Sequence, residues 1–173
     1  MTTPFRKSAL LSALALATLM ACQPAADSTV TPVEIGNATS CALDGMLLAD
    51  YPGPKAQIHF ANQNEPEFFC DTIEMFSVLL NPEQVRKVTG VFVQDMGATD
   101  WTSPKGAWID ARKAFYVMGS SKKGSMGATY ASFAQKVDAE KFVQEYGGHV
   151  MQFDDFKPEM AKLDGGALHD SHM

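Results

Sequence analysis

The order of apolar patterns along residues 57–153 occurs twice, and this repetition limits the folds that the chain can adopt. Two short strand-like runs are followed by an amphipathic helical pattern and then by a further strand-like run, first over residues 57–93 and again over residues 114–153. Direct residue identity between the two halves is slight. We therefore predict an α+β fold, a single domain of two tandem ββαβ units with a mainly antiparallel sheet.

Each predicted unit contains one helix with its own start signal. In the first unit Asp71 is the expected N-cap of a helix that ends near residue 80. In the second unit Asp138 is the expected N-cap, and a glycine pair at residues 147–148 marks the end of the helix. The predicted strands cover residues 57–60, 67–70, 88–93, 114–118, 129–133 and 149–153.

Residues 1–21 have the layout of a lipoprotein signal peptide. Arg6 and Lys7 form a short positive region, an apolar run covers residues 9–19, and a small residue precedes Cys22. The run is too short for a transmembrane helix, which needs roughly 20 apolar residues. We expect Cys22 to be the lipid-bearing first residue of the mature protein and to anchor it on the periplasmic side of a membrane.

Two segments without apolar periodicity flank the predicted domain. Residues 22–40 are rich in Pro, Ala, Thr and Ser and are predicted to form a flexible tether. Residues 157–173 are predicted to form a flexible C-terminal tail, which leaves residues 41–156 as the folded domain. Gln23, in place of an aspartate, favours the outer membrane of a Gram-negative cell.

Charge and cysteine spacing exclude several classes of function. Loss of Arg6 and Lys7 with the signal peptide changes the formal net charge from −6 to −8, which argues against nucleic acid as a partner. Cys41 has no second cysteine at the Cys-x-x-Cys spacing and no histidine base that can be assigned to it, so we expect no enzymatic activity. A disulfide between Cys41 and Cys70 remains open in an oxidising compartment.

Sulfur donors beside bending backbone indicate where chemistry could take place. Cys41 and Met46 flank Gly45, which can take a positive φ and fold both sulfurs toward one point. Met126 lies in a glycine-rich connection, where it is not expected to be part of the hydrophobic core. Thiolates and thioethers are soft ligands that suit Cu(I). The alternative is a core cysteine and a buried methionine beside a turn.

Six short motifs form a specific combination across the domain. They are Cys41 with Gly45-Met46, the run Asp50–Ile58, Trp108–Ala111, Tyr116–Ser120, Met126-Gly127 and Tyr146–Gly148. Together they resemble the NosL family, the accessory lipoproteins of nitrous oxide reductase. The resemblance covers nearly the whole domain and implies a pair of ββαβ units. Many members carry Cys-x-x-Cys-Gly-Met, whereas Asp44 takes the place of the second cysteine here.

The resemblance implies a periplasmic Cu(I) chaperone that supplies copper for the copper-sulfide site of nitrous oxide reductase in denitrification. The implied partners are the nitrous oxide reductase apoprotein and its membrane maturation transporter complex. The implied ligands are Cys41 as thiolate and Met46 and Met126 as thioethers, with Asp44 or His59 as a harder donor. Asp44 could also help to hold a second ion such as Zn(II). The alternative function is a thiol-redox or disulfide-stapled lipoprotein that scaffolds assembly without metal transfer.

Overall fold

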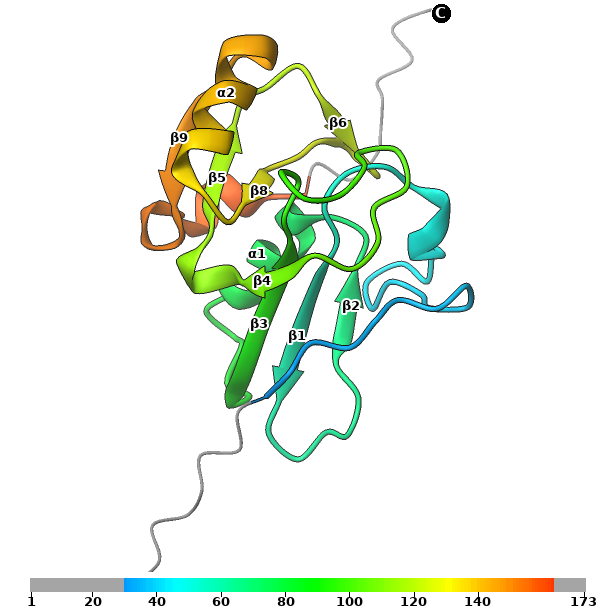
Figure 1. Cartoon of the computed structure of the whole chain (residues 1–173). Helices are drawn as coiled ribbons and strands as arrows, with labels where there is room; N and C mark the ends of the chain where they lie inside the picture. Colours follow the sequence, from blue (N-terminus) through cyan, green and yellow to red (C-terminus); the bar gives the residue numbers. More distant parts are fainter. Residues whose placement is uncertain (1–29, 164–173) are drawn as a thin grey trace, which may run out of the picture.

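Two antiparallel sheets with the same strand arrangement form the framework of the protein (Figure 1). The structure, a computed structural model, describes residues 30–163, so the predicted signal peptide and Cys22, the predicted site of lipid attachment, lie outside the described residues. The first sheet has the order β2-β1-β3-β4, with β1 at Ala56–Phe60, β2 at Glu67–Phe69, β3 at Val88–Gln94 and β4 at Trp108–Asp110. The second has the order β8-β5-β9, with β5 at Phe115–Met118, β8 at Ala131–Phe133 and β9 at His149–Gln152.

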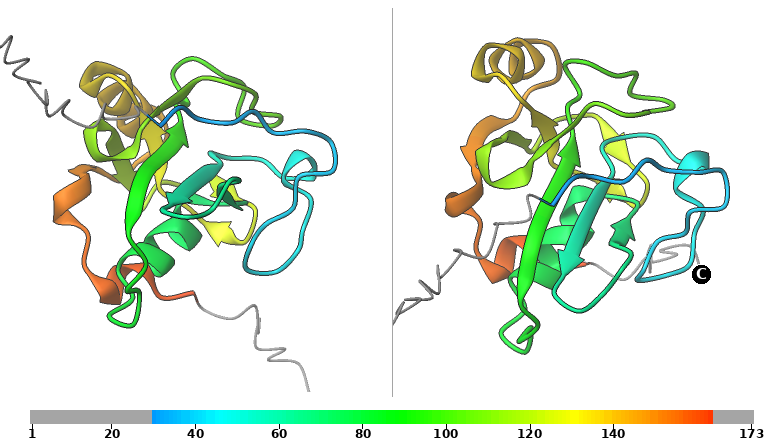
Figure 2. Two further views of the ribbon diagram at one scale, coloured as in Figure 1. Left: turned by 90° about the horizontal axis from the view of Figure 1, so that it is seen from below. Right: turned by 60° about the horizontal axis from the view of Figure 1, so that its bottom comes forward.

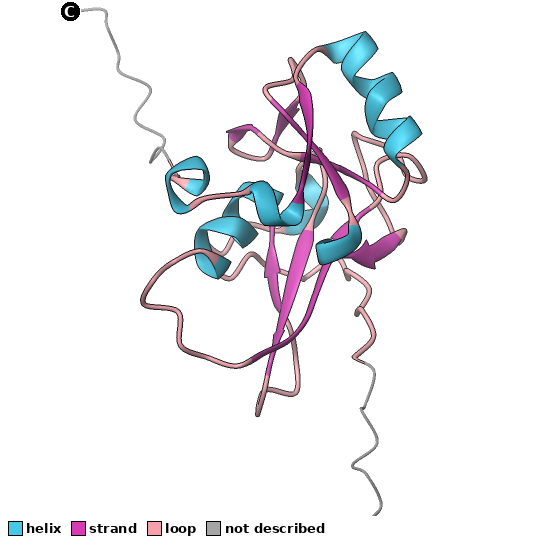
Figure 3. Cartoon of the chain, turned by 90° about the vertical axis from the view of Figure 1, so that its left-hand side faces the viewer, coloured by secondary structure: helices cyan, strands magenta, loops and turns pink. Residues whose placement is uncertain are grey.

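In both sheets the first strand of the unit is central. β1 lies between β2 and β3, and β5 lies between β8 and β9, with every pairing antiparallel. One helix connects the second and third strands of each unit, α1 (Thr72–Leu79) in the first and α2 (Lys136–Tyr146) in the second. The predicted α+β fold of two tandem ββαβ units is therefore confirmed. Figure 3 shows the longer helix α2 at the upper right, well separated from α1.

Two features of the framework were not predicted. β4 extends the first sheet beyond β3, and a short hairpin of β6 (Lys123–Gly124) and β7 (Gly127–Ala128) is inserted between β5 and β8. Both are only two or three residues long, so they leave no periodic pattern in the sequence. Within residues 30–163 there are also four 3-10 turns, at Leu48–Asp50, Ala111–Lys113, Phe153–Asp155 and Pro158–Ala161.

The two helices begin in different ways. Asp71 caps α1 as predicted, because its carboxylate accepts the Ile73 N–H at 3.0 Å and Glu74 completes a capping box. The prediction that Asp138 caps the second helix is wrong, because α2 begins after Gln135. The Gln135 side chain makes no capping hydrogen bond. Asp138 lies in the first turn, where a negative charge stabilises the helix dipole.

Aromatic side chains from both units meet in one core. Phe76 of α1 is fully buried and stacks on Phe156, with ring centroids 4.0 Å apart. Edge-to-face contacts link the same ring to Tyr116 of β5 and to Tyr130, which precedes β8. The core therefore joins the first helix to the second sheet, and the two units form one domain.

Segments on both sides of the expected domain are part of the folded structure. Val33 exchanges two hydrogen bonds with the Gln57 side chain, at 2.8 and 2.9 Å, so residues 30–35 lie across the face of the first sheet opposite α1 (Figure 2, left). At the other end Ala161 is buried, and the Tyr130 hydroxyl donates to the Met160 carbonyl. The expected limits at residues 41 and 156 are therefore too narrow on both sides.

The described helices are short. α2 is the longer of the two α-helices, with 11 residues. Within residues 30–163 no helix has the length and apolar character needed to cross a membrane.

Candidate metal centre

A tight turn folds Cys41 back on its own neighbours. The Cys41 N–H donates to the Met46 carbonyl at 2.8 Å, and Gly45 closes the turn at a φ of +77°. The Asp44 carboxylate accepts the Met46 N–H at 3.0 Å. The predicted positive φ of Gly45 is confirmed, and it is the geometry that brings the side chains of this turn to one side.

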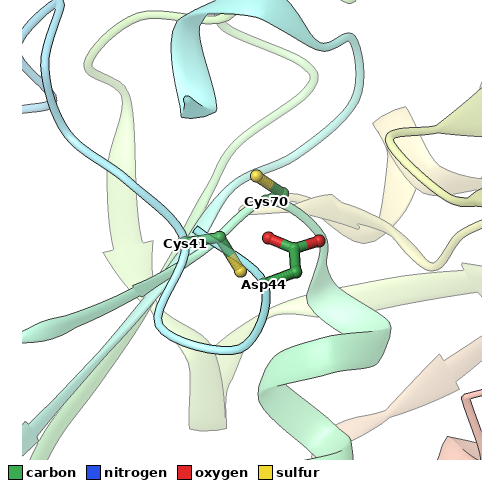
Figure 4. Close-up of side chains that lie close together, drawn as sticks. All are labelled: Cys41, Asp44 and Cys70. Carbon is green, nitrogen blue, oxygen red and sulfur yellow. The ribbon is translucent and has the colours of Figure 1, made fainter. Parts of the chain in front are cut away.

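This turn is docked on the end of β2. The Ala42 N–H donates to the Phe68 carbonyl at 2.8 Å, which places Cys41 beside Cys70, the residue between β2 and the cap of α1. The sulfurs of both cysteines and a carboxylate oxygen of Asp44 all lie within 4.8 Å of one another (Figure 4). Both cysteines are buried and Asp44 is exposed, so the group opens to solvent on its carboxylate side.

The Cys41 sulfur has a polar environment. It lies 3.3 Å from Glu74 Oε2 and accepts the Leu43 N–H at 3.4 Å. The Cys70 thiol donates to the Met46 carbonyl at 3.8 Å, and neither cysteine is in a disulfide. The two sulfurs are therefore available as ligands.

The two thiols differ in acidity. A hydrogen bond from the Cys70 thiol, opposed by burial and supported by backbone N–H groups, lowers the pKa of Cys41 to about 6. The same interaction with Cys41, together with burial, raises the pKa of Cys70. At neutral pH the pair thus contains one thiolate, the form that attacks and binds metal ions.

Two buried charged side chains surround the sulfurs. Burial, followed by the nearby charge of Cys41, raises the pKa of Glu74 to about 8. Lys55 is only 1% exposed and donates from Nζ to the carbonyls of Pro52 and Cys70, at 2.9 and 3.1 Å. Burial lowers the pKa of Lys55, while the charges of Cys70 and the neighbouring carboxyl groups raise it. In its charged form this lysine is a fixed countercharge for anionic sulfur.

A pocket of about 310 Å³ adjoins this group. Its walls come from the Cys41 turn, α1, the β6–β7 hairpin and the end of the described chain: Leu43, Asp44, Ile73, Glu74, Met126, Ala128, Lys162 and Leu163. Asp44 and Glu74 connect the pocket to the sulfurs, because both carboxyl groups lie close to Cys41. Met126 is 51% exposed and faces the same pocket from the hairpin.

The structure brings most of the predicted site residues into this one region. Cys41 and Asp44 belong to the group itself, Met46 packs against the buried cluster that contains both cysteines, and Met126 lines the adjoining pocket. His59 does not join the group. Its Nε2 lies 2.9 Å from Gln57 Oε1, and its ring packs edge-on against Phe92 on the first sheet.

Cys70 and Glu74 were not among the predicted ligands. Cys70 directly precedes the Asp71 cap, and Glu74 occupies the capping-box position three residues after it, so a cysteine followed by this box was a usable signal. What the sequence could not show is the hydrogen bond between Ala42 and Phe68 that brings the Cys41 turn to this helix start.

Two sulfur atoms and one carboxylate at the edge of a pocket form a set of donors for a soft or borderline metal ion. Residues 32–161 match the family model of NosL. The chain belongs to the NosL family. The resemblance inferred from the sequence motifs is thereby confirmed.

Named NosL proteins match most of the chain. The copper-binding lipoprotein NosL of Stutzerimonas stutzeri is 37% identical over 147 residues, which are 82% of this chain and 76% of that protein. The copper-binding lipoprotein NosL of Achromobacter cycloclastes is 37% identical over 154 residues, which are 87% of this chain and 80% of that protein.

A solved NosL structure has the same fold. The crystal structure of the copper chaperone NosL from Shewanella denitrificans is 39% identical and superimposes with a TM-score of 0.71, covering 76% of this chain and 98% of that one. These NosL relatives are described as copper-binding lipoproteins or as a copper chaperone, and none of these descriptions names an enzymatic activity.

Proposed function

We propose that this protein is a membrane-anchored periplasmic Cu(I) chaperone that delivers copper for assembly of the copper-sulfide site of nitrous oxide reductase. The observation that carries the proposal is the Cys41–Asp44–Cys70 group, whose donor atoms lie within 4.8 Å at the edge of a pocket. The names of the NosL relatives support copper as the cargo.

The donor set favours Cu(I) over harder ions. Cys41 supplies a thiolate at neutral pH, and Cys70 becomes a second one when the metal displaces its proton. This pair replaces the Cys-x-x-Cys dithiolate that Asp44 interrupts in the sequence. The thioethers of Met46 and Met126 are further soft donors, the first beside the cysteines and the second across the pocket.

Release of the ion follows from the same arrangement. The sulfurs are buried, but the pocket beside them opens to solvent between Leu43 and Met126, which are 46% and 51% exposed. A partner thiolate or imidazole can enter there and displace one ligand at a time. A site of few, soft ligands therefore holds Cu(I) and still transfers it by ligand exchange.

We further propose that the site can hold a second, harder ion such as Zn(II). Asp44 offers an exposed carboxylate within 4.8 Å of both sulfurs, and a mixed sulfur and oxygen set suits Zn(II). In this arrangement Asp44 and a sulfur bind the harder ion while the thioethers stay with Cu(I).

The proposed location restricts the partners. A lipid at Cys22 would keep the domain at the periplasmic face of the outer membrane, close to the nitrous oxide reductase apoprotein and to its maturation transporter complex in the cell envelope. The described domain needs no membrane contact of its own to be retained there.

Binding of Cu(I) tests the proposal directly. Anaerobic competition with a chromophoric Cu(I) chelator should show tight binding of one Cu(I) per chain. Cys41→Ser should weaken this binding by about 100-fold or more, because loss of a metal ligand costs at least as much affinity as loss of a residue that only orients a ligand. Met126→Leu should weaken binding, whereas the matched change Met160→Leu, outside the pocket lining, should not. Unchanged affinity in Cys41→Ser would refute the site.

Delivery needs its own experiment. Copper-loaded protein should restore nitrous oxide reductase activity in copper-depleted cells that lack the chromosomal copy, and Cys41→Ser should not. Restoration by Cys41→Ser at the same protein level would favour the metal-free scaffold. Thiol counting on the freshly purified protein separates the remaining alternative, because two free thiols in the domain agree with the structure and none would indicate the disulfide staple.

A further inference from the structure

Met126 is carried by a hairpin that has little structure of its own. β6 and β7 pair over two residues each, and so short a ribbon is at best marginally stable in isolation. The Met126 side chain in its turn is 51% exposed and belongs to none of the hydrophobic clusters of residues 30–163. The position of this proposed ligand must therefore be set by contacts between the hairpin and the rest of the domain.

The segment that leaves the hairpin is hydrogen-bonded to the start of α1. Thr129 directly follows β7, and its hydroxyl donates to Asp71 Oδ1 at 2.6 Å. The carbonyl of the next residue, Tyr130, accepts from the Thr72 hydroxyl at 2.7 Å. Asp71 and Thr72 are fully buried and Thr129 is nearly so, which strengthens both bonds. Cys70 immediately precedes this pair, so the hairpin is anchored next to one of the two sulfurs.

The strand that enters the hairpin packs against the same carboxyl group. A Cβ at Gly124 of β6 would overlap Asp71 Oδ2 and would lie 2.9 Å from the Thr129 Cβ, so the close approach requires glycine. Gly124 also approaches Gly53, where an added Cβ would lie 3.0 Å from the Gly124 Cα. The Asp71 side chain is therefore in contact with both arms of the hairpin, the strand that enters it and the residue that follows it.

We propose that Asp71 is a positioning residue of the copper site, which holds the hairpin through Thr129 and Gly124 so that the Met126 thioether faces the ion bound at the cysteines. This inference rests on the proposed function, because it concerns how one ligand of that copper site is held. Asp71 is covalently bonded to Cys70, so a shift of that cysteine at the start of α1 moves the anchor of the hairpin with it. Sulfur ligands from distant parts of the sequence thus keep one geometry.

Thr129→Val tests the anchor without changing Cys70 or the residue that caps α1. The variant keeps a branched side chain and removes the hydroxyl that donates to Asp71. In anaerobic competition with a chromophoric Cu(I) chelator it should bind Cu(I) about tenfold more weakly, the effect expected for loss of a group that only orients a ligand. Gly124→Ala, whose Cβ would overlap the Asp71 carboxyl group, should displace the hairpin and give a loss of the same kind.

Ser132→Ala is the matched control for the loss of a buried hydroxyl. The Ser132 hydroxyl is fully buried and donates to the Gln94 carbonyl at 2.7 Å, in β8 and outside the hairpin. Its removal should lower the thermal unfolding temperature, as Thr129→Val does, and leave the Cu(I) affinity unchanged. A general loss of stability is thereby distinguished from misplacement of the Met126 thioether.

Two further measurements show whether the anchor acts through Met126. The double variant Thr129→Val/Met126→Leu should bind Cu(I) within about twofold of Met126→Leu alone, because a misplaced hairpin has no further effect once the thioether is gone. In protein labelled at the methionine methyl groups, the Met126 methyl NMR signal should shift on addition of Cu(I). In Thr129→Val this shift should be much smaller.

The outcomes separate this inference from the proposed function. If the unmodified protein binds Cu(I) through Cys41 but Thr129→Val and Gly124→Ala bind it equally well, the positioning inference is refuted and the chaperone proposal stands. The same holds if the effect of Thr129→Val adds in full to that of Met126→Leu. If the unmodified protein binds no Cu(I), the proposed function fails first and the inference fails with it.

Discussion

The two ββαβ units share one strand arrangement but differ at the start of their helices. In the first unit Asp71 caps α1 and Glu74 closes the capping box, and both carboxyl groups are buried beside Cys70. In the second unit Gln135 is exposed and makes no capping bond, and the nearby Asp138 is half-buried and paired with Lys141. The same framework thus carries a buried polar cluster in one copy and a solvated helix end in the other.

The buried cluster is unfavourable by itself. Burial raises the pKa of Asp71 to about 6, and its Oδ2 has no hydrogen-bond partner among the described residues. Buried carboxyl groups that are incompletely paired lower stability. The candidate metal site therefore depends on stabilisation from elsewhere, and the aromatic core around Phe76 provides it because Phe76 belongs to α1.

The largest effect is expected in this aromatic core. Phe76→Ala should lower the free energy of unfolding by about 4 kcal/mol, because the ring is fully buried and contacts Tyr116, Tyr130 and Phe156. The corresponding change on α2, Phe142→Ala, removes a partly buried ring and should cost about half as much. Urea denaturation of the two variants measures the difference.

Equal destabilisation by the two changes would contradict this asymmetry between the units. Phe76→Leu is the control for shape, since it keeps most of the apolar volume and should recover a large part of the lost stability.

A smaller effect is expected at the helix starts. In the unmodified protein the buried Thr129 hydroxyl donates to Asp71 Oδ1 at 2.6 Å. Asp71→Ala should lower the free energy of unfolding by about 2 kcal/mol, because it removes both the helix cap and the acceptor of this hydroxyl. Gln135→Ala should change it by less than about 0.5 kcal/mol, since no capping bond is lost. Thermal and urea unfolding of both variants test this. An unchanged free energy of unfolding in Asp71→Ala would show that the cost of burying the carboxylate cancels the stabilisation from the cap.

The sequence predicted local structure better than contacts between distant segments. The Asp71 cap, the positive φ of Gly45 and the central elements of both units follow from residue type and periodicity over a few neighbours, and all are confirmed. Asp138 was misplaced because an aspartate suits both an N-cap and a first turn, and only the backbone distinguishes them.

Only the part of the candidate site that lies within one local turn was predicted from the sequence. Cys41, Asp44 and Met46 lie in one turn, so their proximity follows from the Gly45 bend. Cys70 reaches them only through the pairing of the turn with β2, which no local pattern encodes. His59 was a reasonable nitrogen donor by type, but strand alternation turned it to the sheet face covered by residues 30–35.

The smallest effect is expected on the solvated helix of the second unit. Lys136 and Glu140 of α2 form an i,i+4 ion pair at 3.1 Å, with side chains 63% and 50% exposed. Solvent screens such a pair, and a lysine N-terminal to its glutamate is the weaker orientation on a helix. A double-mutant cycle with Lys136→Ala and Glu140→Ala should give a coupling energy of about 0.3 kcal/mol or less, vanishing near 1 M salt. A coupling above about 1 kcal/mol would mean that the helix start of the second unit is also held by charge, and the contrast between the units would then lie in burial alone.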